Sequence, residues 1–329
     1  MQPFEIKKQK GVDQNIMSQA DPLPFYSVII PHYNDKEGLS ECLSALAQQD
    51  FPQEKYEVIV IDDCSAEDYT DYFQSHFPFA GFYRQPTNRG PAAARNRGIS
   101  LAQGTYLVFT DSDVCPGPSW LSTFTEGFSS GTDILCGPVF HGPNILERLT
   151  ALTACGEYLE NNDGFRNHCP GGNFAVKASV IEGFFFDEDV EFAGEDTLLS
   201  TRLAASGHTI RYLAAAWVIH KPKISITSYA RRAFRYGIGF RGSRMRCPFL
   251  SGYWLHKYLR CVSGLPLFFI RTGIDLRRLA MHRKLLQINL LNLPVFVLGV
   301  LATRLFYATG VFWSYFAPHY SHEKRKKIH

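Results

Sequence analysis

The sequence predicts an α/β fold, an open and mostly parallel sheet flanked by helices, followed by amphipathic and apolar helices near the C-terminal end. Through residue 113, short apolar runs alternate with segments whose apolar residues recur at helical spacing. Each apolar run ends in polar residues. After about residue 228 the chain becomes basic and then almost continuously apolar. The alternation in the first part is typical of a sheet with helices on both faces.

The first strand is predicted over residues 25–31, followed by a turn at residues 32–35. Apolar residues three or four positions apart then indicate a helix: Leu39, Cys42, Leu43 and Leu46. A second strand over 57–61 is followed by two acidic residues, a helix is expected over 68–77, and a short third strand over 81–84.

A loop over residues 87–91 leads into a helix over 92–102, which Gly104 caps. The next strand covers residues 106–109. Ligands of such sheets bind outside the carboxyl ends of the strands. Three polar residues lie at those ends: Tyr33, Asp63 and Asp113.

The composition is that of a folded protein. The 329 residues are 45% hydrophobic and 20% charged, and the formal net charge is only +3, so no nucleic-acid partner is expected. The eight cysteines form no CxxC pair, which argues against a zinc site or a disulfide framework and favours reduced thiols in a cytosolic setting. Residues 1–24 lack an apolar segment, so no signal peptide is expected.

Five segments are predicted along the chain. A polar tail over 1–22 precedes an α/β domain over 23–228. A basic amphipathic segment over 229–284 leads into an apolar, membrane-associated helix or hairpin over 285–317, and a basic tail over 318–329 follows.

The apolar segment is longer than the roughly 20 residues that span a bilayer. Basic residues flank both of its ends: Arg277, Arg278, Arg283, Lys284, Lys324, Arg325, Lys326 and Lys327. Because basic flanks prefer the cytoplasmic side, we expect a hairpin bent near Pro294 or Arg304, or helices lying in the interface, at the cytoplasmic face of the cell membrane. A buried pair of core helices is the alternative, and the sequence leaves open whether the segment crosses the bilayer.

The first chemical signal follows the strand over 106–109. Asp111 and Asp113 stand two positions apart, so both carboxylates can reach one small volume at the tip of the strand. A hard divalent cation takes carboxylate oxygens and bridges them to diphosphate oxygens. Acidic-x-acidic triplets are common in solvated turns, and the position of this one after a buried strand favours the cation site.

Taken in order, the polar motifs resemble those of glycosyltransferase family 2. They are Ser27–Asn34, Val58–Ser65, Asn88–Asn96, Thr110–Asp113, Gly171–Asn173, Gly194–Asp196 and His220. The resemblance covers residues 25–220 and implies a GT-A fold, inverting transfer from a nucleotide-sugar donor, and a Mn²⁺ or Mg²⁺ cofactor. The QxxRW motif of processive synthases is absent, so transfer of single sugars is expected.

The donor site is assigned to residues at the sheet edge and in the loops beside it. They are Pro31, Tyr33, Asp63, Arg89, Arg95, Asp111, Ser112 and Gly172. The family places a uracil contact at the acid that corresponds to Asp63, so UDP is the expected nucleotide. Tyr33 can stack on the base, with a packed turn residue as the alternative. Asp62 is assigned a structural role.

The loop beside this edge offers cationic and backbone contacts. Arg89 and Arg95 bracket the opening of a helix, where an arginine can contact phosphate or base. For Arg95, an internal salt bridge is an alternative of equal weight to contact with the donor. Gly172 allows the backbone to approach the sugar or diphosphate, with an ordinary tight turn as the alternative.

By the family's motif, Asp113 ligates the metal and Asp111 contacts the ribose or a metal-bound water. A strand predicted over 213–219 ends at His220. A neutral imidazole there can complete a divalent site, and several GT-A enzymes use a histidine at this position. A structural histidine is the alternative.

Glu195 and Asp196 precede a helix predicted over 197–203. A helix N-terminus favours negative charge and helps to keep a carboxylate ionised. An inverting transfer needs one general base for the acceptor hydroxyl. By family position Asp196 is that base and Glu195 orients the acceptor or sugar, whereas simple helix capping is the alternative for both.

Arg231, Arg232 and Arg235 lie three or four positions apart, next to aromatic residues. They can hold anionic lipid headgroups or close over the diphosphate. The lipid role is assigned to most of them and the diphosphate to at most one.

The sequence thus predicts a membrane-associated, metal-dependent inverting glycosyltransferase. The expected donor is a nucleotide-sugar, and the expected acceptor is a hydroxyl of a lipid-linked or polysaccharide glycan, in cell-surface glycan or exopolysaccharide biosynthesis. A catalytically silent, membrane-tethered nucleotide-sugar-binding module is the alternative. A nucleotidyltransferase would need a Gly-rich basic loop after the first strand, where this chain has residues 31–35.

Overall fold

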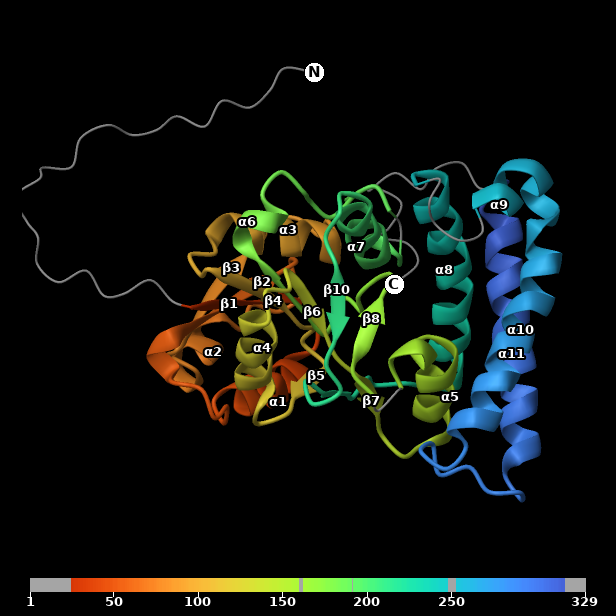
Figure 1. The fold of residues 1–329 in the computed structure, drawn as a ribbon, viewed down its shortest axis with the longest axis horizontal. Coiled ribbons are helices and arrows are strands. Elements are labelled where there is room, and N and C mark those ends of the chain that lie inside the picture. The colour runs from red at the N-terminus through yellow and green to blue at the C-terminus, as the bar shows by residue number, and fades with distance from the viewer. Residues whose placement is uncertain (1–24, 160–161, 191, 248–252, 317–329) are drawn as a thin grey trace, which may run out of the picture.

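The computed structural model of the chain describes residues 25–159, 162–190, 192–247 and 253–316. An α/β domain carries a layer of long helices along one side, as Figure 1 shows. The predicted tails over 1–22 and 318–329 lie outside the described residues.

Within the described residues, a central sheet has eight strands in the order β3-β2-β1-β4-β9-β6-β10-β8. The strands are β1 (Tyr26–His32), β2 (Tyr56–Asp62), β3 (Ala80–Arg84), β4 (Tyr106–Phe109), β6 (Ile134–Cys136), β8 (Gly164–Arg166), β9 (Phe174–Lys177) and β10 (Ile210–Tyr212). The first four are parallel to one another, β9 is antiparallel to β4 and β6, and β8 is antiparallel to β10. The predicted open, mostly parallel sheet is confirmed.

A smaller sheet joins β5 (Val114–Pro116), β11 (Val218–His220) and β7 (Val139–His141), with β11 in the middle. The prediction of one strand over 213–219 was wrong. The backbone N–H of Ala216 donates to the carbonyl of Leu213, so the chain turns there and pairs again only from Val218. The apolar run is therefore divided between a turn and β11.

Helices cover both faces of the central sheet. They are α1 (Lys36–Leu46), α2 (Thr70–His76), α3 (Pro91–Leu101), α4 (Trp120–Ser129), α6 (Ala178–Ile181) and α7 (Glu195–Ala205). Helix α5 (Ile145–Thr153) packs instead against β7 of the smaller sheet and against the C-terminal helices. Asp35 caps α1 by accepting the backbone N–H of Gly38. Helix α3 has Pro91 in its first turn, after Gly90 at φ 88°.

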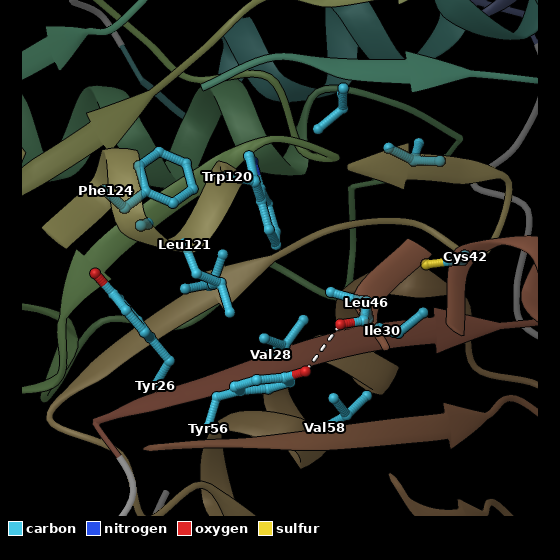
Figure 2. Packing of buried hydrophobic residues seen from close by; sticks show 14 of the residues in the cluster. Tyr26, Val28, Ile30, Cys42, Leu46, Tyr56, Val58, Trp120, Leu121 and Phe124 are labelled. Carbon is cyan, nitrogen blue, oxygen red and sulfur yellow. Dashed lines mark hydrogen bonds between the residues drawn. The ribbon is translucent and has the colours of Figure 1, made fainter. Parts of the chain in front are cut away.

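Strand β1 supplies both hydrophobic cores because alternate side chains of a strand point to opposite faces. Val28 and Ile30 pack with Leu46 of α1 and Trp120 of α4, as Figure 2 shows. Ile29 packs on the opposite face. Both faces of β1 are buried, which explains the uninterrupted apolar run and fixes the position of the strand's carboxyl end.

Four helices follow the α/β domain: α8 (Ile226–Met245), α9 (Tyr253–Leu259), α10 (Gly264–His282) and α11 (Leu293–Trp313). Among the described residues, α11 is the one helix long and apolar enough to cross a membrane. The chain reverses at residues 283–292, directly before Pro294, near which a bend was predicted, whereas the alternative bend at Arg304 was wrong, because α11 runs through that position. Pro294 lies in the first turn, where a missing N–H costs nothing, and Arg304 is buried.

Candidate active site

The carboxyl ends of β1, β2 and β4 bring the predicted donor residues to one edge of the sheet. Pro31 of β1 lies in register with Ile61 of β2 and is buried. Its side chain therefore has a packing role, and a donor contact there stays a prediction. Tyr33, one residue past the strand, is 38% exposed, so its ring lies at the surface of this edge.

Asp63 organises the loop that follows β3. Its carboxylate accepts the backbone N–H groups of Arg89 at 2.8 Å and Gly90 at 2.7 Å, and the side-chain amide of Gln85 at 2.8 Å. Burial raises the pKa of Asp63 to about 6, although these hydrogen bonds oppose the rise. The neighbouring Asp62 bonds Ser65 and Arg84 instead, as its assigned structural role requires.

Arg89 and Arg95 have different surroundings. The Arg89 side chain is about half exposed and pairs with Glu188 at 2.5 Å. The Arg95 guanidinium is buried and donates to Asp111 at 2.6 Å and to Glu195 at 2.8 Å. Burial alone would lower the pKa of Arg95, but the facing carboxylates raise it. Arg95 thus forms the internal salt bridge that the sequence left open, and contact with the donor stays a prediction.

The two acids of α7 lie at the first turn of the helix, after Gly194 at φ 100°. Asp196 accepts the backbone N–H of Gly171 at 2.8 Å and that of Thr197 at 2.6 Å. Glu195 is buried, and burial together with the neighbouring Asp196 raises its pKa despite Arg95. Desolvation and Asp196 therefore outweigh the backbone hydrogen bond at the helix N-terminus and the charge of Arg95, both of which favour the charged form of Glu195.

The Gly171–Asn173 turn lies against both groups of acids. A Cβ on Gly171 would lie 3.0 Å from an Asp196 carboxylate oxygen, and one on Gly172 would lie 2.9 Å from a carboxylate oxygen of Asp111. Asn173 is fully buried and bonds Trp120 at 2.8 Å, so its role is structural. Ser112 lies in the loop beside Asp111, where its carbonyl approaches Gly38 of α1.

Asp113 and His220 meet through the smaller sheet. The Nε2 atom of His220 lies 3.0 Å from Oδ2 of Asp113. Burial would raise the pKa of Asp113, but His220 and Arg232 lower it below its usual value. Among the described residues, no three Cys, His, Asp or Glu side chains form a group that could hold a metal. In the described part of the chain, a cation at this point would therefore have the Asp113 carboxylate and the His220 imidazole as its protein ligands.

Two further residues near the site, His141 and Tyr236, were not assigned to it from the sequence. His141 Nε2 lies 3.1 Å from His220 Nδ1, and burial with the nearby charges of His220 and Arg232 lowers the pKa of His141 to about 3. Tyr236 of α8 is close enough to the acids of α7 for their charge to act on it, and burial raises its pKa to about 12. Arg232 of α8 lies near enough to Asp113, His141 and Tyr236 for its charge to act on all three. The sequence signal for His141 was only a polar residue after a short apolar run.

Comparisons with known proteins agree with this geometry. Residues 27–180 match the family model described as glycosyl transferase family 2. Glycosyltransferase AglE of Haloferax volcanii is 29% identical over 225 residues, which are 66% of this chain and 73% of AglE. The pre-mycofactocin glycosyltransferase of Mycobacterium tuberculosis is 29% identical over 223 residues, 64% of this chain and 46% of that protein.

A solved structure shares the fold over most of the chain. The mannosyltransferase PcManGT of Pyrobaculum calidifontis, in complex with GDP-Man and Mn²⁺, superposes with a TM-score of 0.58 at 18% identity and covers 88% of both chains. The silent-module and nucleotidyltransferase alternatives are not favoured by these relatives. The chain belongs to glycosyltransferase family 2 and is a glycosyltransferase with a GT-A-like fold.

Proposed function

We propose that this enzyme moves one sugar from a nucleoside-diphosphate sugar, with UDP as the expected nucleotide, to a hydroxyl of a lipid-linked or polysaccharide acceptor. The observation that carries the proposal is the double ion pair of Arg95, which joins Asp111 of the acidic triplet to Glu195 beside Asp196. Asp111, which neighbours the proposed metal ligand Asp113, and Glu195, which neighbours the proposed base Asp196, are therefore both held by the buried guanidinium of Arg95.

Asp196 is proposed as the general base. Its Oδ1 accepts the backbone N–H and the hydroxyl of Thr197, and its Oδ2 accepts the backbone N–H of Gly171. These bonds fix the carboxylate, while Oδ2 keeps one lone pair. The free lone pair of Oδ2 can accept the proton of the attacking hydroxyl, a contribution typically worth about 10²- to 10⁴-fold in rate. Glu195, paired with Arg95, is proposed to orient the acceptor or sugar through the shared network.

Asp113 and His220 are proposed to hold a divalent cation. One carboxylate oxygen and one imidazole nitrogen, 3.0 Å apart, supply two donors on one side of an ion, which leaves other positions for diphosphate oxygens. Carboxylates suit Mg²⁺ and Mn²⁺, whereas imidazole suits transition metals, so the mixed set favours Mn²⁺ over Mg²⁺. When bound, the cation neutralises charge that develops on the leaving diphosphate. Arg232 adds a fixed positive charge near Asp113.

Tyr33, Asp63 and Arg89 are proposed to form the nucleotide end of the donor site. The exposed ring of Tyr33 can stack on a base. Asp63 holds the loop at Arg89 and Gly90 by two backbone hydrogen bonds, and with Gln85 also bound to Oδ1 its Oδ2 retains one lone pair for a base N–H. The backbone atoms of Pro31, Ser112 and Gly172 are proposed to line the same donor site.

The cytoplasmic face of the cell membrane is the proposed location. The support is the apolar helix α11 together with the basic helices beside it. A lipid-linked acceptor or a growing glycan would then be met at the membrane surface, where Arg231 and Arg235 are proposed to contact lipid headgroups.

A donor-hydrolysis screen of the purified protein tests the proposal. The panel contains UDP-, GDP- and dTDP-sugars, each with Mn²⁺, with Mg²⁺ or with chelator, beside an Asp196→Asn variant. GDP-sugars are included because PcManGT was solved with GDP-Man. Metal-dependent hydrolysis of one donor, lost in the variant, supports the proposal and identifies the sugar. Metal-independent hydrolysis, or equal rates in the variant, would overturn the assigned roles.

A further inference from the structure

The outward face of helix α11 is largely apolar over its whole length. Every exposed position of α11 carries an uncharged residue. Large side chains are exposed along it: Val295 at 48%, Leu298 at 65%, Leu305 at 57%, Phe306 at 42% and Phe312 at 50%. Helix α10 adds exposed Leu265, Phe269 and Met281. Contiguous exposed apolar surface of this extent marks an interaction site on a soluble protein.

The opposite face of α11 is built into the fold. Arg304 is buried, pairs with Asp275 of α10 at 2.5 Å and donates to the carbonyl of Thr153 at 2.6 Å. Tyr229 of α8 bonds Thr303 at 2.8 Å. Helix α11 is thus tied by buried polar contacts to α5, α8 and α10.

Helices α8 and α11 also lie side by side over most of their length. A Cβ on Gly237 of α8 would lie 2.1 Å from the carbonyl oxygen of Tyr307, and one on Gly310 would lie 2.0 Å from the carbonyl oxygen of Phe234. Figure 1 shows α8 between the α/β domain and the pair α10–α11. Any movement of α11 into a bilayer must therefore carry α8 with it.

The C-terminal helical region carries a large excess of positive charge. Residues 226–316 contain fourteen Lys and Arg residues and a single acidic residue, Asp275, which is fully buried. Exposed cations lie on α9, directly after α9, on α10 and in the turn after α10: Lys257, Arg260, Arg277 and Lys284. Near an anionic bilayer each basic residue contributes about 1 kcal/mol of attraction. The charge therefore complements acidic lipid headgroups.

We propose that α10 and α11 lie in the plane of an anionic bilayer, with their exposed apolar faces in the boundary between headgroups and acyl chains, and that α11 does not span the membrane. A spanning α11 would draw α8 and its arginines, among them Arg231 and Arg235, into hydrocarbon, at a cost of about 2.5–3.5 kcal/mol or more for each charge. The inference rests on the proposed membrane association and not on the transfer chemistry.

Depth-dependent quenching by brominated lipids tests the orientation. In the full-length protein with Trp254→Phe and Trp313→Phe, one tryptophan is introduced at a time by Leu298→Trp, Leu305→Trp or Phe312→Trp. These positions are seven residues apart on one exposed face of α11. In vesicles of phosphatidylcholine and phosphatidylglycerol, the in-plane arrangement gives the same shallow depth for all three. A deep Leu305→Trp between two shallow ends would overturn the proposal.

Vesicle co-sedimentation tests the surface itself. Leu298→Gln with Leu305→Gln should reduce binding to anionic vesicles at least about tenfold, whereas Phe165→Gln with Phe185→Gln, at exposed positions of the α/β domain, should leave binding unchanged. Binding that resists the first pair, or a concentration-dependent dimer with no affinity for vesicles, would contradict the proposal. Donor hydrolysis measured without vesicles reports the transfer site separately.

A second inference concerns His141. Strand β11 places His220 in register with Val114 of β5 on one side and with His141 of β7 on the other. The imidazole of His220 is thus held between two partners, Asp113 Oδ2 at 3.0 Å and His141 Nε2 at 3.1 Å. A hydrogen bond to the second nitrogen of a ligating histidine fixes its ring orientation and tautomer.

We infer that His141 is a positioning residue that keeps Nε2 of His220 directed at the cation site beside Asp113. The inference rests on the proposed metal site. His141→Phe keeps an aromatic ring but removes the hydrogen bond to His220 Nδ1. His141→Gln can place a polar side-chain atom where Nε2 of His141 lies and so restore that bond. Loss of such a partner typically weakens metal binding about 10- to 100-fold.

Electron paramagnetic resonance of free Mn²⁺, titrated with protein in the presence of UDP, measures the affinity directly. Weaker binding in His141→Phe, partly restored in His141→Gln, with an unchanged melting temperature, supports the inference. Wild-type affinity in His141→Phe alongside weak binding in His220→Ala would overturn it. Wild-type affinity in both would overturn the metal site as well.

Discussion

The guanidinium of Arg95 on α3 lies 2.8 Å from the Glu195 carboxylate on α7, although a hundred residues separate them in the sequence. The same guanidinium lies 2.6 Å from Asp111 after β4. One buried cation therefore sets the distance between the end of a central strand and the N-terminus of the helix that carries Asp196.

Replacing Arg95 should destabilise the protein strongly. In Arg95→Leu, Glu195 stays buried without its partner, and breaking a buried pair in this way costs about 3–5 kcal/mol. Arg89→Ala removes an ion pair with a half-exposed arginine and should change stability by no more than about 1 kcal/mol. Urea unfolding at pH 7 measures both, and equal effects would contradict the role given to Arg95.

Asp63 should make stability depend on pH. Its pKa rises from 3.8 to about 6 on folding, so the folded state holds the proton more tightly than the unfolded state. The stabilisation is complete below pH 4 and is lost as pH rises to about 6, by about 3 kcal/mol at 1.4 kcal/mol per pKa unit. The wild type should therefore lose stability relative to Asp63→Asn over this range. A stability difference independent of pH would contradict the raised pKa.

Glycine is required where α11 meets α8. Gly310→Ala would place a Cβ 2.0 Å from the carbonyl oxygen of Phe234, and backbone on both sides prevents an easy shift, so a loss of about 1–3 kcal/mol is expected. In Gly242→Ala on α8 the new methyl group meets nothing within 4 Å, and helix propensity should stabilise by about 0.5–1 kcal/mol. Thermal unfolding of the two variants distinguishes a tight contact from a general effect of alanine.

Sequence patterns predicted the elements of the first half closely. The strand predicted over 25–31 is β1 at Tyr26–His32, and the helix predicted over 92–102 is α3 at Pro91–Leu101. These patterns are local, since buried strands such as β1 are apolar on both faces and helices such as α1 and α3 begin at Asp35 and at Gly90-Pro91. The same reasoning placed Tyr33, Asp63 and Asp113 at one edge of the sheet.

Features that depend on distant contacts were missed. His141 reaches His220 only because β7 pairs with β11 across 79 residues. Arg304 reads as a break in an apolar run, but α11 continues through it and the distant Asp275 neutralises its charge. The raised pKa of Glu195 follows from its burial and from the neighbouring Asp196, against the effect of Arg95, and no local pattern reports that burial.

The most direct measurement is the rate of donor hydrolysis by Asp196→Asn, with the donor chosen from the screen, together with donor affinity by calorimetry in the presence of Mn²⁺. Glu147→Gln, at another carboxylate in the first turn of a helix, is the matched control. The proposed base predicts a fall in kcat of about 10²- to 10⁴-fold in Asp196→Asn, with donor affinity unchanged and Glu147→Gln at the wild-type rate. A wild-type kcat in Asp196→Asn would contradict the assignment of Asp196 as the general base.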